Sequence, residues 1–259
     1  MTLRIHATLD YALARPTDLI LQIEAAHLPE QPVSNATLDL SAHEHFARVP
    51  AQDGIGERVL LRAPEGRFTA DYHAQVTIDR LLADVQGLEA VPPHLLPGET
   101  IPYLLDSCYC PANAFRSFVQ EQFGDLAGGP LIVAQRDYIH TRFRYMAGAS
   151  DVTTTALETF VRRQGVCRDF AHMLITLARA GGVPARIASV YGLGVEPQDF
   201  HAVAEVFLDG AWHLVDPTGM ARAGDMAKIG IGRDAADVAF LTAFGPVTMN
   251  AQSIEVTAG

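Results

Sequence analysis

The sequence predicts an α+β protein in two parts, an all-β sandwich over residues 1–100 and a domain of helices and strands over residues 103–259. Short apolar–polar alternations separated by turn residues fill the first part, which is typical of half-buried strands in a sandwich. After Pro102 the apolar residues recur at helical spacing instead. Alternating segments return on either side of Asp209-Gly210, a two-residue hairpin turn, so an antiparallel sheet is expected there. We expect the helices of the second part to pack on this sheet.

The first part is expected to contain five strands. Residues 3–11 alternate between apolar and polar side chains, as a strand with one buried face requires. Clusters of proline, glycine and aspartate separate this strand from the later ones. The other strands are expected at residues 19–24, 36–40, 58–62 and 68–78. The proline-rich residues 91–98 then predict a linker into the second part.

Capping residues define the elements of the second part. Thr155 and Glu158 fit a capping box that opens a helix running to residue 163. A further helix begins at or near Cys167 and runs to residue 180, before Gly181-Gly182. Two earlier helices are expected at residues 111–123 and 130–143, strands at residues 185–191, 201–208, 211–216 and 247–256, and a glycine-rich loop at residues 224–232.

The composition limits the class of protein. The chain has 259 residues, 49% hydrophobic and 19% charged, so it can bury a sizeable core. A net charge of −11 argues against nucleic acid or an anionic membrane as a partner. Three cysteines and an N-terminal segment without an apolar block favour a soluble protein of a reducing compartment, and we expect a cytoplasmic one.

Cys167 is the candidate nucleophile. A thiol reacts as the thiolate, and the unpaired N–H groups and positive dipole at a helix start favour that anion. The backbone N–H of Cys167 could also donate to the oxyanion of a tetrahedral intermediate, and the candidates for a second donor are Tyr145, Gln164 and Tyr191. A lone cysteine in an apolar helix is otherwise a small core residue, so the interpretation depends on its partners.

The expected hairpin supplies those partners. If Asp209-Gly210 forms the turn, then Asp216 faces Val203, which shares a sheet face with His201. His201 and Asp216 are then diagonal neighbours, within reach of a hydrogen bond that would orient the imidazole. Singly, each residue has a structural explanation, but the common face and the cysteine favour a Cys-His-Asp triad.

Four motifs together resemble the core of the bacterial transglutaminase-like superfamily: Gly165-Val166-Cys167-Arg168-Asp169-Phe170-Ala171-His172, Gly182-Val183-Pro184-Ala185-Arg186, His201-Ala202 and Asp216-Pro217-Thr218. The resemblance covers roughly residues 103–259, and residues 1–100 are similar to the N-terminal region that often precedes this core. It implies a papain-like fold in which Cys167 is the nucleophile, His201 the general base and acid, and Asp216 the orienting carboxylate. Many members carry an aromatic residue where this chain has Val203. The difference implies that the side of the active site that receives the acceptor has another shape.

Three functions remain open from the sequence. The first is a cysteine hydrolase that cleaves peptide or amide bonds through a thioester acyl-enzyme, and the second is a transglutaminase that passes the acyl group to an amine. The third is a binding protein that kept the fold without the chemistry. A peptide or protein substrate is expected, and no cofactor is implied. No metal site is expected either, because Cys108 and Cys110 have no second pair of ligands.

Overall fold

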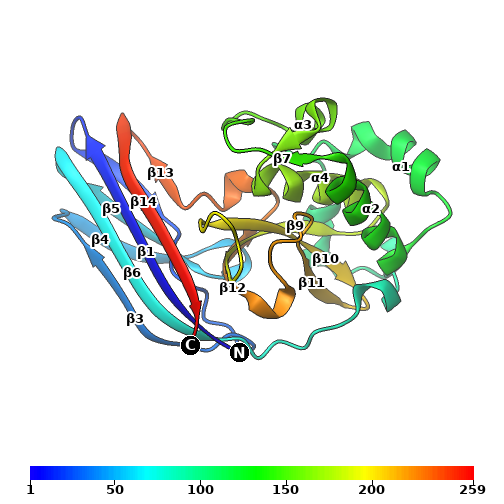
Figure 1. Cartoon of the computed structure of the whole chain (residues 1–259), viewed down its shortest axis with the longest axis horizontal. Helices are drawn as coiled ribbons and strands as arrows, with labels where there is room; N and C mark the ends of the chain where they lie inside the picture. The colour runs from blue at the N-terminus through cyan, green and yellow to red at the C-terminus, as the bar shows by residue number, and fades with distance from the viewer.

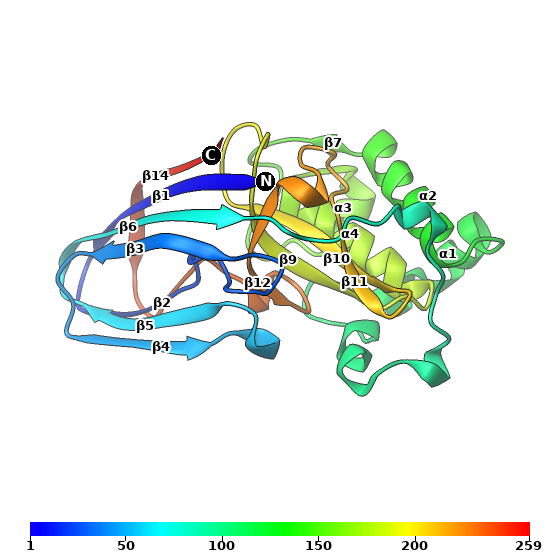
Figure 2. The same ribbon diagram turned by 90° about the horizontal axis from the view of Figure 1, so that it is seen from below.

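The computed structural model describes residues 1–259 as two packed halves, a β-sandwich and a mixed half in which helices cover one sheet (Figure 1). The sandwich has two antiparallel four-stranded sheets, ordered β14-β1-β6-β3 and β13-β2-β5-β4. Figure 2 shows the two sheets as stacked layers. The strands are β1 (Thr2–Leu13), β2 (Thr17–Leu21), β3 (Val33–Leu40), β4 (His45–Pro50), β5 (Glu57–Ala63), β6 (Gly66–Thr77), β13 (Leu241–Ala243) and β14 (Val247–Ala258).

Alternation of side chains builds this sandwich. In β1 the residues from Leu3 to Leu13 at every second position are buried, and those between them face outward. β6 lies beside β1 with the same alternation, so both strands contribute one apolar face to the core between the sheets. β4 was not expected, because its alternation is weak: it is an edge strand on which no residue is fully buried.

The division of the chain differs from the expected one at the C-terminus. Residues 241–258 were expected to belong to the second domain, but β14 pairs with β1 along its length and β13 pairs with β2. Both strands therefore complete the sandwich, and the mixed half is an insertion between β6 and β13. The physical reason is that β1 and β2 would otherwise expose a row of unpaired backbone groups at the sheet edges.

The mixed half contains one antiparallel sheet ordered β11-β10-β9-β12, with α4 packed against it. A two-stranded parallel pair joins β7 to β8. The elements are α1 (Arg116–Phe123), α2 (Gly128–Arg142), β7 (Arg144–Tyr145), α3 (Ala156–Arg162), β8 (Gln164–Gly165), α4 (Cys167–Ala180), β9 (Ala185–Gly192), β10 (His201–Leu208), β11 (Ala211–Val215) and β12 (Met226–Gly232). No helix is long and apolar enough to cross a bilayer.

Residues 224–232, expected as a loop, contain the buried strand β12 instead. Its glycines are sites of close approach rather than of a turn. A Cβ added at Gly230 would lie 2.0 Å from Nε2 of Gln22 in the sandwich. Gly230 therefore lets the side chain of Gln22 pack directly on the backbone of β12.

Buried polar contacts also join the two halves. The hydroxyl of Tyr191 on β9 donates to the carbonyl of Ile23 at 2.6 Å. The side chain of Gln31 donates to the carbonyl of Lys228 at 2.9 Å and accepts from its N–H at 2.6 Å. The two halves are therefore joined by specific buried hydrogen bonds as well as by apolar packing.

Candidate active site

The start of α4 is held by a buried carboxylate. Asp169, in the first turn, is 1% exposed and accepts a hydrogen bond from the N–H of Val166 at 2.8 Å. Its carboxylate also accepts from the hydroxyl of Ser150 at 2.5 Å and pairs with Arg168 at 3.0 Å. An anion at this position favours the helix start, and it fixes where α4 begins. Cys167 is the first residue of the helix, as expected.

The expected hairpin forms with the expected register. Asp209 and Gly210 both have positive φ, and Leu208 faces Ala211 across the turn. His201 is the first residue of β10, and its Nε2 lies 2.9 Å from Oδ2 of Asp216. Both side chains are almost fully buried, at 0% and 2% exposure. The structure thus brings together the histidine and the carboxylate that the hairpin argument paired.

The Asp216-Pro217-Thr218 turn keeps the carboxylate ionised. Oδ1 of Asp216 accepts from the N–H and hydroxyl of Thr218 at 2.8 and 2.7 Å, and Oδ2 also accepts from the N–H of Ala221 at 3.0 Å. Burial alone would raise the pKa of Asp216, but the hydrogen bond from His201, the positive charge of that ring and these donors lower it. The contribution of Thr218 was not expected from the sequence, although a hydroxyl two residues after an aspartate is a common turn arrangement.

Cys167 and Asp216 both stabilise the protonated form of His201. Burial alone would lower the pKa of the imidazole, but the hydrogen bond to Asp216 and the negative charges of Asp216 and of the neighbouring Cys167 sulfur raise it to about 10. Because Nε2 faces the carboxylate of Asp216, the proton on that nitrogen is fixed by its partner. Nδ1 of His201 is buried and makes no hydrogen bond. It is the ring nitrogen that the bond to Asp216 leaves free.

The geometry favours Tyr145 as the candidate for a second oxyanion donor. β7 pairs with β8 so that Tyr145 lies beside Gly165, two residues before the cysteine. Burial and the neighbouring Cys167 sulfur raise the pKa of the Tyr145 hydroxyl to about 12. The nearby backbone N–H of Cys167 acts in the opposite direction and lowers the pKa of that hydroxyl. The phenol and this N–H therefore border the same space beside the sulfur.

Two other residues considered for that role lie differently. Tyr191 is fully buried, and its hydroxyl is committed to the carbonyl of Ile23. Gln164 lies on β8 beside Arg144, one residue further from the cysteine than Gly165. The distinction between Tyr145 and Tyr191 could not come from the sequence, because it depends on how β7 and β9 are placed.

Neighbouring polar residues have structural roles. Glu205, on the same face of β10 as His201, is fully buried between Arg186 and Lys228, each at 2.7 Å. Burial would raise the pKa of Glu205, but these two cations lower it. His172, on α4, is also fully buried, and its Nε2 accepts from the N–H of Ala235 at 3.1 Å. Burial lowers the pKa of His172 to about 3, so its ring is neutral.

The other two cysteines differ from Cys167 in exposure. Cys108 is exposed, Cys110 is buried and Cys167 is half-buried. The thiol of Cys110 lies 3.7 Å from the carbonyl of His172 on α4. Burial raises the pKa of the Cys110 thiol to about 12, so this sulfur is held as an unreactive thiol.

Comparison with known proteins agrees with this architecture. The sequence model of the transglutaminase-like superfamily matches residues 119–217, the region that contains all three residues of the proposed triad. The crystal structure of a Cytophaga hutchinsonii protein, provisionally named a cysteine protease, superposes with a TM-score of 0.92 and is 30% identical. That match covers 99% of this chain and 90% of the other.

Curated relatives are uncharacterised proteins of mycobacteria. One from Mycobacterium leprae is 30% identical over 118 residues, which is 42% of each chain. One from Mycobacterium bovis is 31% identical over 175 residues, covering 60% of this chain and 55% of the relative. The chain therefore spans only about half the length of the curated relatives it matches.

The fold and the matched region define a transglutaminase-like protein. Its candidate site lies where the start of α4, the start of β10 and the turn at Asp216 come together. Because a 30% identical structure is covered over nearly its whole length, the chain belongs to the transglutaminase-like superfamily.

Proposed function

We propose that the protein is a cysteine hydrolase of peptide or amide bonds, with Cys167, His201 and Asp216 as its catalytic triad. The carrying observation is the buried His201–Asp216 pair at 2.9 Å, whose remaining ring nitrogen is unpartnered and whose imidazole interacts with the Cys167 thiol. A structural role alone does not require a half-buried thiol beside this pair. The name of the Cytophaga hutchinsonii protein supports the same reaction class.

In the proposed reaction, His201 holds the proton and Cys167 supplies the electron pair. The thiolate sulfur attacks the substrate carbonyl carbon, and the carbonyl oxygen becomes an oxyanion facing the Cys167 N–H and the Tyr145 hydroxyl. The tetrahedral intermediate collapses, the carbon–nitrogen bond breaks, and Nδ1–H of His201 protonates the departing amine. A thioester remains on Cys167.

Water completes the cycle. Nδ1 of the now neutral His201 removes a proton from a water molecule, which attacks the thioester carbonyl. The second intermediate collapses, the carbon–sulfur bond breaks, and a carboxylic acid leaves as the thiolate–imidazolium pair is restored. Asp216 steadies the imidazolium in both steps without giving up its own negative charge.

Alkylation tests the nucleophile directly. The intact protein is treated with iodoacetamide, and labelling of each cysteine is followed by mass spectrometry. Cys167 is expected to react at least tenfold faster than Cys108, although Cys108 is the more exposed of the two. Equal, slow labelling of both would contradict the proposal.

A substrate assay tests the reaction. The protein is incubated with a casein-like protein, with and without a primary amine probe, and a Cys167→Ala variant is the matched control. New N-termini or released ammonia that depend on Cys167 would support hydrolysis. Incorporation of the amine would show transfer instead. No cysteine-dependent product with any tested peptide or amide would favour the non-catalytic alternative.

Substrate and compartment follow from the same proposal. A thiol nucleophile persists where thiols stay reduced, so we place the working protein in the cytoplasm with peptides or proteins as its substrates.

A further inference from the structure

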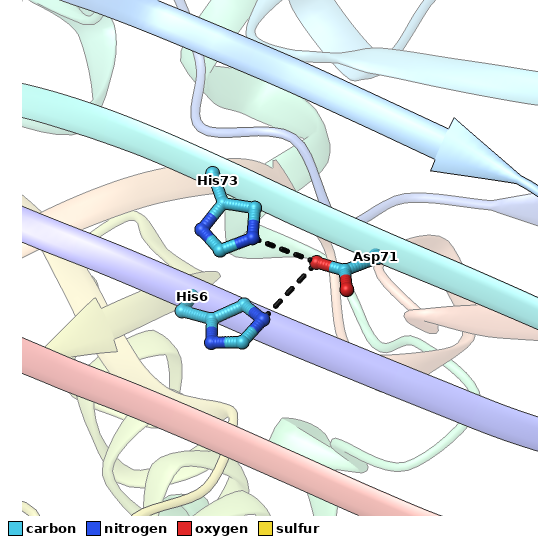
Figure 3. Close-up of side chains that lie close together, drawn as sticks. All are labelled: His6, Asp71 and His73. Atoms are coloured by element: carbon cyan, nitrogen blue, oxygen red, sulfur yellow. Dashed lines mark hydrogen bonds and ion pairs between the residues drawn. The ribbon is translucent and has the colours of Figure 1, made fainter.

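Two histidines and an aspartate converge on the outer face of the sandwich, in the half of the molecule that does not carry the triad (Figure 3). His6 on β1 and His73 on β6 are direct cross-strand partners. Their rings stack with centroids 3.9 Å apart and an angle of 14° between the planes. Nε2 of each ring lies 3.0 Å from the same carboxylate oxygen, Oδ1 of Asp71.

The strand geometry brings the three side chains together. His6 belongs to the outward-facing set of β1, whose alternate residues fill the core. Asp71 and His73 are two residues apart on β6, so they also share its outward face. All three side chains are between 39% and 50% exposed, so the core does not require them.

The cluster has the donor set of a transition-metal site. The three ligand atoms lie within 4.8 Å of one another. In a tetrahedral zinc site with ligands about 2.0–2.2 Å from the metal, neighbouring ligand atoms are roughly 3.3 Å apart. The two nitrogen–oxygen distances of 3.0 Å therefore differ from that spacing by only a few tenths of an ångström. Two imidazoles and one carboxylate would leave the fourth position to water.

The surrounding charge suits a cation. Along the sheet, His6 faces Glu255 of β14, and Asp71 faces Asp39 of β3. Both flanking carboxylates are exposed and lie on strands next to the cluster. Arg4, two residues before His6 on the same face, is the one cation in this part of β1, so the acidic groups outnumber it.

We propose that His6, Asp71 and His73 form a surface binding site for Zn²⁺. Imidazole nitrogens favour zinc and related transition ions over calcium or magnesium, which prefer oxygen ligands. The bound ion would join β1 to β6 by a second link beside the backbone ladder. Because the unfolded chain does not hold the three ligands together, Zn²⁺ would bind only the folded state and would raise the melting temperature of the protein.

Calorimetric titration of the Cys167→Ala variant of the 259-residue chain with Zn²⁺ at about pH 8, where deprotonated ligands favour binding, tests this site. The Cys167→Ala background matters because a reactive thiol beside a histidine could itself bind zinc. One ion per chain is expected, with a rise in melting temperature. Adding His73→Gln should weaken binding at least tenfold and abolish most of that rise. Adding His45→Gln, at an exposed histidine on β4, should change neither.

Three results would overturn the proposal. They are no binding in the Cys167→Ala background, unchanged affinity in a His6→Gln, His73→Gln double variant, and equal loss in the His45→Gln control. Circular dichroism of each variant confirms that its fold is retained, which surface positions favour. Because none of these measurements uses catalysis, they stand independently of the hydrolase proposal.

Discussion

Asp216→Asn would remove the charge that stabilises the protonated imidazole of His201. The ring lies buried at 2.9 Å from the carboxylate, so the negative charge acts across little solvent. The asparagine amide can still accept one hydrogen bond, but it cannot offset the positive ring. We expect the pKa of His201 to fall in this variant, and the imidazolium to be lost nearer to neutral pH.

The magnitude follows from the raised pKa. The difference between 6.5 and about 10 corresponds to about 5 kcal/mol in favour of the imidazolium, at 1.36 kcal/mol per pH unit. Asp216 and Cys167 share this stabilisation, and together they also overcome the burial of the ring. Loss of an opposite charge at hydrogen-bond distance typically shifts a pKa by about 1–3 pH units, so we expect the pKa of His201 to fall by about 2 pH units, or about 3 kcal/mol.

The same pKa sets the dependence of stability on pH. Because the pKa of His201 is raised in the folded state, its contribution is full below about pH 6.5 and disappears as pH rises through about 10. The gap in unfolding free energy between wild type and Asp216→Asn should therefore be larger at pH 6 than near pH 10.5. The lowered pKa of Asp216 acts at the other end, since its contribution is lost as pH falls through the acidic range.

Nuclear magnetic resonance of isotope-labelled imidazoles measures the titration, and a His201→Gln spectrum identifies the His201 signals. Urea unfolding at the two pH values measures stability. Asp125→Asn, at an exposed loop carboxylate, is the matched control and should leave the His201 titration unchanged. A wild-type His201 that titrates near 6.5, or that titrates identically in Asp216→Asn, would refute the reasoning.

Three further changes test neighbouring parts of the site. Tyr145→Phe should lower kcat about a hundredfold with little change in KM, because an oxyanion donor acts mainly in the transition state; an unchanged kcat would remove Tyr145 from the mechanism. Glu205→Gln should lower the unfolding free energy by about 3–5 kcal/mol in urea titrations, because it leaves two buried cations without their shared carboxylate; a loss under 1 kcal/mol would contradict this. Gly165→Ala should cost about 1–3 kcal/mol in the same titration, because its Cβ would lie 2.6 Å from the Cβ of Asp169, whereas Gly98→Ala has open space and should cost far less.

Local signals predicted the elements that carry the proposed triad. The helix Cys167–Ala180 was expected within a residue or two, because glycines flank it and its apolar residues recur at helical spacing. The hairpin was expected in register, because a two-residue turn with positive φ at both positions leaves one way to pair its strands. The contact between His201 and Asp216 followed from that register.

Long-range pairing was less accessible from the sequence. β14 was expected as a strand, but the alternation of its side chains does not predict its partner. That partner is β1, at the opposite end of the chain. The glycines of β12 resembled a loop because the Gln22 side chain that packs on Gly230 is remote in sequence. Tyr145 could not be separated from Tyr191 for the same reason, since a two-residue strand carries almost no periodic signal.

The sandwich helps to position the proposed catalytic histidine. Gln198, three residues before His201, donates from its side chain to the carbonyl of Val256 on β14 at 3.2 Å and accepts from its N–H at 3.0 Å. Phe200 stacks on Phe240, which lies just before β13, with ring centroids 4.8 Å apart. The loop that delivers His201 is therefore fixed to the C-terminal segment that completes the sandwich. Since β14 pairs with β1, the sandwich supports the segment that leads into His201.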